Sequence, residues 1–197
     1  MYVYYALYKP FGMLSQFTRE APDQTTLADL DVTFAKDVYP VGRLDADSEG
    51  LLLLTNDKRL TDALLHPRHA HPRTYYAQVE GVPDEPALKA LQTGVTIRIN
   101  GQSHRTAPAL AALLPAPPAL PERIPPIRVR KSIPDTWISL QLTEGKNRQV
   151  RRMCAAVGFP VLRLVRVAIG GYAPEGLTAG EVRALSADER ALLTAGR

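Results

Sequence analysis

The sequence predicts an α+β fold with a mixed, largely antiparallel β-sheet flanked by helices. Two observations support this fold class. Strand and helix signals follow one another irregularly along the 197 residues, and hairpin signals outnumber strand–helix–strand crossovers. The composition, 45% hydrophobic and 22% charged, is that of an ordinary globular protein. We therefore expect residues 1–197 to form a single domain, with room for two subdomains that share a cleft.

Short apolar segments predict the first strands. Residues 2–8 are apolar and aromatic, and the turn signal at 9–12 ends them. A second short extended segment is expected at 38–41. The four leucines at 51–54 are typical of a buried strand.

A helix is expected at 56–65. Asn56 is its predicted N-cap, and the His-Pro pair at 66–67 ends it. Leu60 and Leu64 lie one turn apart, so both should face the core.

The middle of the chain predicts a strand, a helix and a hairpin. Residues 74–79 are rich in strand-forming residues. A helix should run between Asp84 and Gly94, which are a favourable start and stop. Residues 97–99 predict a strand, and the Asn-Gly pair at 100–101 is a strong hairpin turn.

Residues 107–126 contain seven prolines. Proline cannot donate to a hydrogen-bonded ladder, which excludes a central strand or a helix interior. The segment is therefore predicted to be an extended, partly polyproline loop that crosses the surface.

The last third predicts a strand at 137–142, a helix at 147–157, a long strand at 161–169, and a short strand followed by a helix at 187–193. Gly158 should end the first of these helices. Its core-facing residues are expected to be Val150, Met153, Cys154 and Val157.

Positive charge is concentrated in one part of the chain. The formal net charge is +4, but residues 128–166 hold nine Lys or Arg against Asp135 and Glu144, a local excess of +7. Most of the basic residues of the chain are arginines, which bind phosphate with two hydrogen bonds and stack on bases. A clustered basic surface favours a polyanionic partner.

The single cysteine, Cys154, excludes an intrachain disulfide and fits a reducing compartment. The apolar start lacks the basic and small-residue features of a signal peptide, and no apolar segment approaches transmembrane length. We expect a cytoplasmic protein without membrane contact.

The densest cluster of chemically active residues is the segment 42–50, which runs directly into the leucines at 51–54. Its carboxylates stand on a glycine-bounded loop ahead of a buried strand, which is a rigid support for a group presented in a cleft. A solvated acidic loop is the alternative. A calcium loop is excluded, because position twelve is Asn56 instead of a bidentate Glu.

Five segments in the same order resemble the RsuA family of bacterial pseudouridine synthases, over nearly the whole chain. They are YALYKP at 5–10, GRLD with SEGLLLLTND at 42–57, RTYY at 73–76, EGKNRQVRRM at 144–153 and GFPVLRLVR at 158–166. We expect the chain to begin directly with the catalytic domain, which makes it similar to the short subfamily, the RluE type, that acts on large-subunit (23S) rRNA. The resemblance implies the pseudouridine synthase fold, with a central catalytic cleft.

The resemblance also implies the reaction. Asp45 would act as nucleophile while uracil leaves its ribose and rejoins it through a ring carbon. This isomerisation needs no cofactor and no metal, and the sequence contains no Walker loop or dinucleotide fingerprint. The implied partner is rRNA, most simply from the large subunit, and we expect a monomer with no obligate protein partner.

Two further residues match the family's catalytic positions. Tyr75 could stack on the base and support proton transfer, although a tyrosine on a half-buried strand is also an ordinary packing residue; Tyr76 should face the opposite way. Arg151 is the expected basic partner of Asp45, with Arg148 and Arg152 as alternatives.

Five residues are predicted to bind the substrate: Arg43, Lys146, Arg148, Arg152 and Leu164. Arg43 could fill the gap left by an extruded base, and Leu164 could pack beneath the uracil, unless it is simply a core residue. The basic residues near 146–152 could bind phosphates at a helix start, or form a solvated helix face.

Two other functions compete with this reading. A non-catalytic RNA-binding or ribosome-assembly protein would explain the basic segment equally well. A carboxylate-dependent hydrolase would pair Asp45 with Asp47 or Glu49. The histidines at 66, 69 and 71 do not make a complete zinc set and are read as loop residues near RNA.

Overall fold

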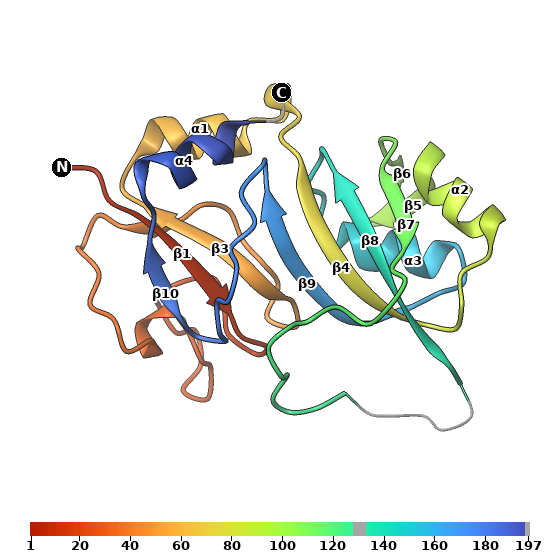
Figure 1. The fold of residues 1–197 in the computed structure, drawn as a ribbon, viewed down its shortest axis with the longest axis horizontal. Coiled ribbons are helices and arrows are strands. Elements are labelled where there is room, and N and C mark those ends of the chain that lie inside the picture. Colours follow the sequence, from red (N-terminus) through yellow and green to blue (C-terminus); the bar gives the residue numbers. More distant parts are fainter. Residues whose placement is uncertain (128–132, 196–197) are drawn as a thin grey trace.

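The computed structural model describes residues 1–127 and 133–195. These residues form one large sheet, a separate hairpin and four α-helices (Figure 1). The strands are β1 Tyr4–Lys9, β2 Tyr39–Pro40, β3 Glu49–Thr55, β4 Arg73–Glu80, β5 Thr96–Ile99, β6 Gln102–Arg105, β7 Leu110–Leu113, β8 Asp135–Leu142, β9 Val161–Ile169 and β10 Val182–Ala184. The helices are α1 Lys58–Leu65, α2 Glu85–Thr93, α3 Gln149–Ala156 and α4 Ala187–Thr194.

The large sheet has the strand order β10-β1-β3-β9-β4-β8-β7, and β2 pairs with β3. Among the paired strands of the described chain, only β3 and β9 run parallel. The predicted α+β class with a largely antiparallel sheet is therefore confirmed.

The contact between β3 and β9 joins the two halves of the sheet through a short register, Glu49 with Val165 and Gly50 with Arg166. Gly50 has φ +97°, and a Cβ there would lie 2.3 Å from the Arg166 carbonyl oxygen. Only glycine permits this approach. The loop that precedes Gly50 is thereby held against β9.

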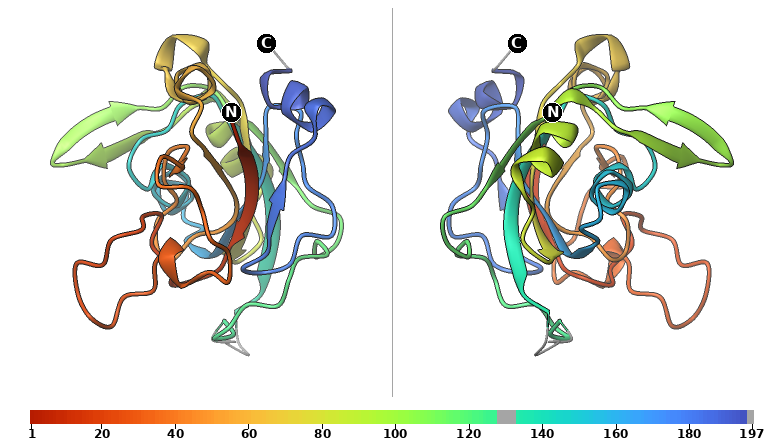
Figure 2. Two further views of the ribbon diagram at one scale, coloured as in Figure 1. Left: turned by 90° about the vertical axis from the view of Figure 1, so that its left-hand side faces the viewer. Right: turned by 90° about the vertical axis from the view of Figure 1, so that its right-hand side faces the viewer.

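Helices cover different parts of the sheet. Helices α1 and α4 lie together over one end, and α2 and α3 lie beside the strands β4, β8 and β7 (Figure 1). Figure 2 shows that the β5–β6 hairpin and the loop between β1 and β2 project from the side of the sheet that carries α3. Helix α4 and strand β10 lie towards the other side.

Most predicted elements are present, with small shifts at their ends. The cap of α1 is Asp57 and not Asn56: its side chain accepts hydrogen bonds from Arg59 N and Leu60 N. Helix α3 begins at Gln149, two residues later than the predicted start. Four side chains of this helix were predicted to face the protein core: Val150, Met153 and Cys154 are buried, and Val157 is partly buried.

The proline-rich segment 107–126 is not entirely a loop. Strand β7 lies within it and pairs with β8 in antiparallel fashion at the end of the sheet. Its sequence, Leu110 to Leu113, contains no proline, and an edge strand leaves one side of its backbone unpaired. The expectation of a loop throughout was therefore wrong for these four residues.

Candidate active site

A cavity of about 880 Å³ lies between the loop that precedes β3, the strands β4 and β9, and the segment that leads into α3. This size is ample for a nucleobase with its ribose. Six of the predicted site residues line it: Arg43, Asp45, Tyr75, Lys146, Arg148 and Leu164. Arg151 and Arg152, the other two, lie outside the lining.

Asp45 lies on a loop whose backbone is held by hydrogen bonds to Ser15. The hydroxyl of Ser15 accepts a hydrogen bond from Leu44 N at 3.0 Å and donates one to Leu44 O at 2.8 Å. These hydrogen-bonding groups are buried, whereas the Asp45 side chain is 38% exposed. A solvent-accessible carboxylate therefore rests on a fixed backbone, which is the arrangement that catalysis requires.

Lys9 supports the same loop, a role that the sequence analysis did not assign. Its side chain is fully buried, and its Nζ donates to Met13 O at 2.7 Å, Pro10 O at 3.0 Å and Ala46 O at 3.4 Å. Burial lowers the pKa of Lys9 to about 8, despite the nearby carboxylates. A lysine at the end of an apolar strand was the only sequence signal for this contact.

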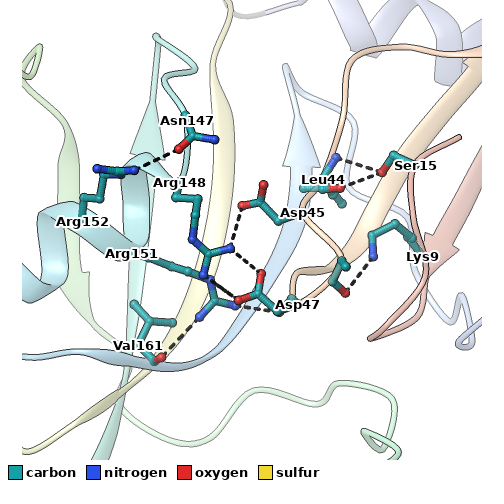
Figure 3. Close-up of polar contacts among 11 residues, drawn as sticks. Lys9, Ser15, Leu44, Asp45, Asp47, Asn147, Arg148, Arg151, Arg152 and Val161 are labelled. Carbon is teal, nitrogen blue, oxygen red and sulfur yellow. Dashed lines mark hydrogen bonds and ion pairs between the residues drawn. The ribbon is translucent and has the colours of Figure 1, made fainter. Parts of the chain in front are cut away.

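Asp47 joins the loop that carries Asp45 to α3. Its two carboxylate oxygens accept hydrogen bonds from Arg148 at 3.0 and 2.7 Å, and Arg151 Nε lies 3.3 Å from its Oδ2. Arg151 also donates to the backbone carbonyls of Asp47 at 2.6 Å and Val161 at 3.3 Å (Figure 3). Two arginines from one helix turn thus converge on this single carboxylate.

The ion pair of Asp45 is formed with Arg148, at 3.6 Å, and not with the expected Arg151. Arg148 is the N-cap residue of α3 and has φ +50°, a conformation that costs a non-glycine residue free energy. Its guanidinium contacts both Asp45 and Asp47. Spacing along the helix could not distinguish the two arginines, because both reach the neighbouring carboxylate of Asp47.

The charges in this cluster affect one another. Burial raises the pKa of Asp47, but the hydrogen bond from Arg148 and the charges of Arg151 and Arg148 outweigh it, so the pKa of Asp47 lies below its ordinary value. Burial lowers the pKa of Arg151, whereas the hydrogen bond to Asp47 raises the pKa of Arg148. Asp47 is therefore ionised near neutral pH and unsuited to act as a proton donor.

Glu49 points away from this cluster into a buried ion pair. Arg163 Nε and Nη2 donate to its two oxygens at 2.9 and 2.8 Å, and Arg163 also donates to Pro121 O at 2.7 Å. The Glu49 and Arg163 side chains are only 3% and 10% exposed. Asp47 and Glu49, the two partners of Asp45 in the hydrolase alternative, are therefore both held by arginines.

The basic surface is smaller than the charge count of the sequence suggests. Arg163 and Arg166 are buried, so they add nothing to the exposed surface. Arg128, Arg130 and Lys131 lie outside the described residues. The exposed basic groups of the window that adjoin the cavity are Lys146 and Arg148.

Tyr75 and Leu164 lie on adjacent strands and face the cavity. Tyr75 is partly buried, and Leu164 is 5% exposed and belongs to the hydrophobic core of α3, β4, β8 and β9. Tyr76, the next residue on β4, is not part of the lining, as the alternation of a strand predicts.

The remaining predicted residues lie around the rim. Arg43 is exposed and reaches Gln16 at 3.5 Å. Lys146 is exposed, and its backbone N–H donates to the Gln149 side chain at 2.9 Å. Arg152 points away, bonding the backbone carbonyl of Arg98 and the Asn147 side chain.

No three His, Cys, Asp or Glu side chains gather to hold a metal ion in the described part of the chain. Cys154 is buried among apolar side chains, which raises the pKa of its thiol to about 12. Among the described residues, no helix combines the length and hydropathy needed to span a bilayer.

Known proteins share this sequence and fold. The family model described as "RNA pseudouridylate synthase" matches residues 3–156. A protein of Xanthomonas axonopodis pv. citri named "Ribosomal large subunit pseudouridine synthase E" is 52% identical over 172 residues, 87% of each chain. A protein of the same name from Vibrio vulnificus is 46% identical over 90% of this chain and 73% of its own.

The structural likeness covers nearly the whole chain. A structure titled "Crystal structure of pseudouridylate synthase" superimposes with a TM-score of 0.77 and 30% identity, over 98% of this chain and 74% of that one. The matched sequence includes the loop of Asp45, the strand of Tyr75 and the start of α3. The chain therefore belongs to the RNA pseudouridylate synthase family, whose members isomerise uridine in RNA.

Proposed function

We propose that this protein converts a uridine of large-subunit (23S) ribosomal RNA into pseudouridine, with Asp45 as the nucleophilic catalyst. The observation that carries the proposal is the Asp45 carboxylate: it is 38% exposed, lines the cavity and stands on a backbone held by Ser15. Relatives named as large-subunit rRNA pseudouridine synthases, 46–52% identical over most of the chain, support the substrate class.

The residues suggest a division of labour. Asp45 attacks or stabilises the ribose C1′ as its bond to the uracil nitrogen breaks, and the base then turns and forms a carbon–carbon bond to C1′. The ring carbon loses a proton and the ring nitrogen gains one, so atoms and electrons balance without a redox partner. Tyr75 supports the base and a proton transfer, and Arg148 orients the Asp45 carboxylate through their ion pair.

Binding is assigned to the rim and floor of the cavity. Lys146 and Arg43 are exposed cations at its edge that attract RNA phosphates, and Leu164 offers an apolar surface for the base. Arg152 is a weaker candidate, because its guanidinium already bonds Arg98 and Asn147.

The experiment offers purified protein three unmodified transcripts: large-subunit rRNA, small-subunit rRNA and tRNA. Pseudouridine is mapped by carbodiimide treatment and primer extension. We expect conversion of one uridine, or very few, in large-subunit rRNA alone. Efficient conversion elsewhere would refute the substrate, whereas tight binding without conversion would favour the non-catalytic RNA-binding alternative.

A further inference from the structure

Two arginines that line the cavity have no acidic partner in the described part of the chain. Arg73 on β4 and Arg166 on β9 both line it. Arg73 Nη2 donates to Leu64 O at 2.7 Å, and Arg166 Nε donates to Leu51 O at 2.7 Å. Neither forms an ion pair with a carboxylate of the described chain, unlike Arg163, whose charge Glu49 neutralises.

The two arginines lie on adjacent strands, and Arg166 is poorly solvated. Arg166 is 5% exposed, and its Nη2 is buried with no hydrogen-bond partner among the described residues. Burial lowers the pKa of Arg73; interaction with Tyr75 raises it, and the charge of Arg166 lowers it again. A buried pair of like charges is costly unless an anion joins it.

The other arginines and the lysine that line the cavity are not buried without a counter-ion. Arg148 is neutralised by Asp47 and Asp45, and Arg43 and Lys146 are exposed to water. The unmet charge is therefore concentrated at Arg73 and Arg166. Tyr75 pairs with Arg166 in the register of β4 and β9, so this charge adjoins the place assigned to the target base.

We propose that Arg73 and Arg166 form a subsite for a phosphodiester group flanking the target uridine. The inference rests on the proposed function, because it takes RNA as the substrate. Guanidinium groups match phosphate oxygens in geometry as well as charge, and every RNA nucleotide carries one such group. The bound phosphate would supply the missing anion and fix the depth at which the nucleotide enters the cavity.

The test combines a protein variant with a neutral linkage in the RNA. Short large-subunit rRNA fragments containing the mapped uridine are made with a methylphosphonate in place of the 5′ or the 3′ phosphodiester. Their binding to protein with Arg73 or with Arg73→Gln is measured in an Asp45→Asn background, so that affinity is read without turnover. Arg59→Gln, an exposed arginine on α1 outside the cavity, is the matched control.

With Arg73 present, we expect one of the two neutral linkages to weaken binding about tenfold. With Arg73→Gln, the same linkage should change binding less than about twofold, and the control variant should retain the full loss. Additive losses at both linkages would overturn the subsite. A second result would also overturn the subsite: Arg73→Gln, with Asp45 intact, lowers kcat but shows no coupling to either linkage. That result would mean that these arginines interact with the charge on the departing uracil.

Arg166→Gln is the second variant, with circular dichroism and thermal unfolding measured first because Arg166 also bonds the Leu51 carbonyl. A folded Arg166→Gln protein should show the same coupling as Arg73→Gln, and additivity would count against the subsite. If the transcripts show no pseudouridine at all, the proposed function fails. If they are converted but no coupling appears, only the subsite fails.

Discussion

Asp45 and Glu49 lie four residues apart on the chain, and each contacts an arginine, but the two contacts differ in burial and in closeness. Glu49 and Arg163 form a buried pair with 3% and 10% exposed side chains and two short hydrogen bonds. Asp45 is 38% exposed and lies 3.6 Å from Arg148, which is bound more closely to Asp47. A carboxylate whose oxygens are fully used holds structure together, whereas one that is loosely paired and accessible remains available for chemistry.

The largest effect on activity is expected at Asp45, the accessible carboxylate. Asp45→Asn should reduce pseudouridine formation by at least about a thousandfold, because the amide cannot act as a nucleophile. Unfolding free energy should change by less than about 1 kcal/mol, since the side chain is exposed. Tritium release from uridine-labelled RNA and urea unfolding measure both. Activity within tenfold of the parent would contradict the assignment.

Glu49→Gln should do the reverse. Removing the charge leaves Arg163 buried without a counter-ion, which costs about 3–5 kcal/mol of unfolding free energy. The protein that remains folded should keep its turnover rate. Urea unfolding provides the first measurement and active-site-normalised kinetics the second. The double variant Glu49→Leu with Arg163→Met is the control, and it should recover most of the lost stability if uncompensated charge is the cause.

Tyr75 and its neighbour Tyr76 give a matched pair on two faces of one strand. Tyr75→Phe keeps the ring but removes the hydroxyl, so turnover should fall by roughly 10–100-fold with little change in RNA affinity. Tyr76→Phe should leave both unchanged. Single-turnover rates at saturating RNA distinguish these outcomes, and equal rates for the two variants would return Tyr75 to a packing role.

Asp47 combines features of the two contacts: its side chain is 35% exposed, but it has two arginine partners. Asp47→Asn should cost about 1 kcal/mol, less than Glu49→Gln, because solvent screens the pairs. The pKa of Asp47 is lowered in the folded state, so its stabilising effect is present above its unfolded value and disappears as the pH falls through the folded one. Urea unfolding at a series of pH values from 7 down to 2 checks this; a difference between the two proteins that does not shrink as the pH falls would point to packing instead.

The smallest effect concerns RNA affinity at the rim. Replacing Lys146 and Arg43 by Gln should reduce the slope of log affinity against log salt by up to about 2 units without changing which uridine is modified. A parallel double variant, Arg59→Gln with Arg190→Gln, removes the same charge far from the cavity and should leave the slope nearly intact. An altered target uridine would show that these residues also read RNA shape.

Local sequence signals were sufficient for most elements. The Asn-Gly turn at 100–101, the cap at Asp84 and the strand Val161–Ile169 follow from turn chemistry and periodicity. These local signals failed where pairing with another strand decided the secondary structure. Strand β7 exists because its backbone pairs with β8, which proline counting over the whole segment concealed.

For the site, the sequence by itself determined which chemistry is available and the order in which its residues occur. A glycine-bounded GRLD segment before a buried strand, and the family resemblance it carries, identified Asp45, Tyr75 and the arginine-rich start of α3. Tertiary structure alone decided which charges meet. Arg148 pairs with Asp45 and Asp47, Arg163 pairs with Glu49, and Arg73 and Arg166 have no acidic partner among the described residues. Ion pairing depends on distance and burial across strands far apart in the chain, and neither quantity is encoded in local spacing.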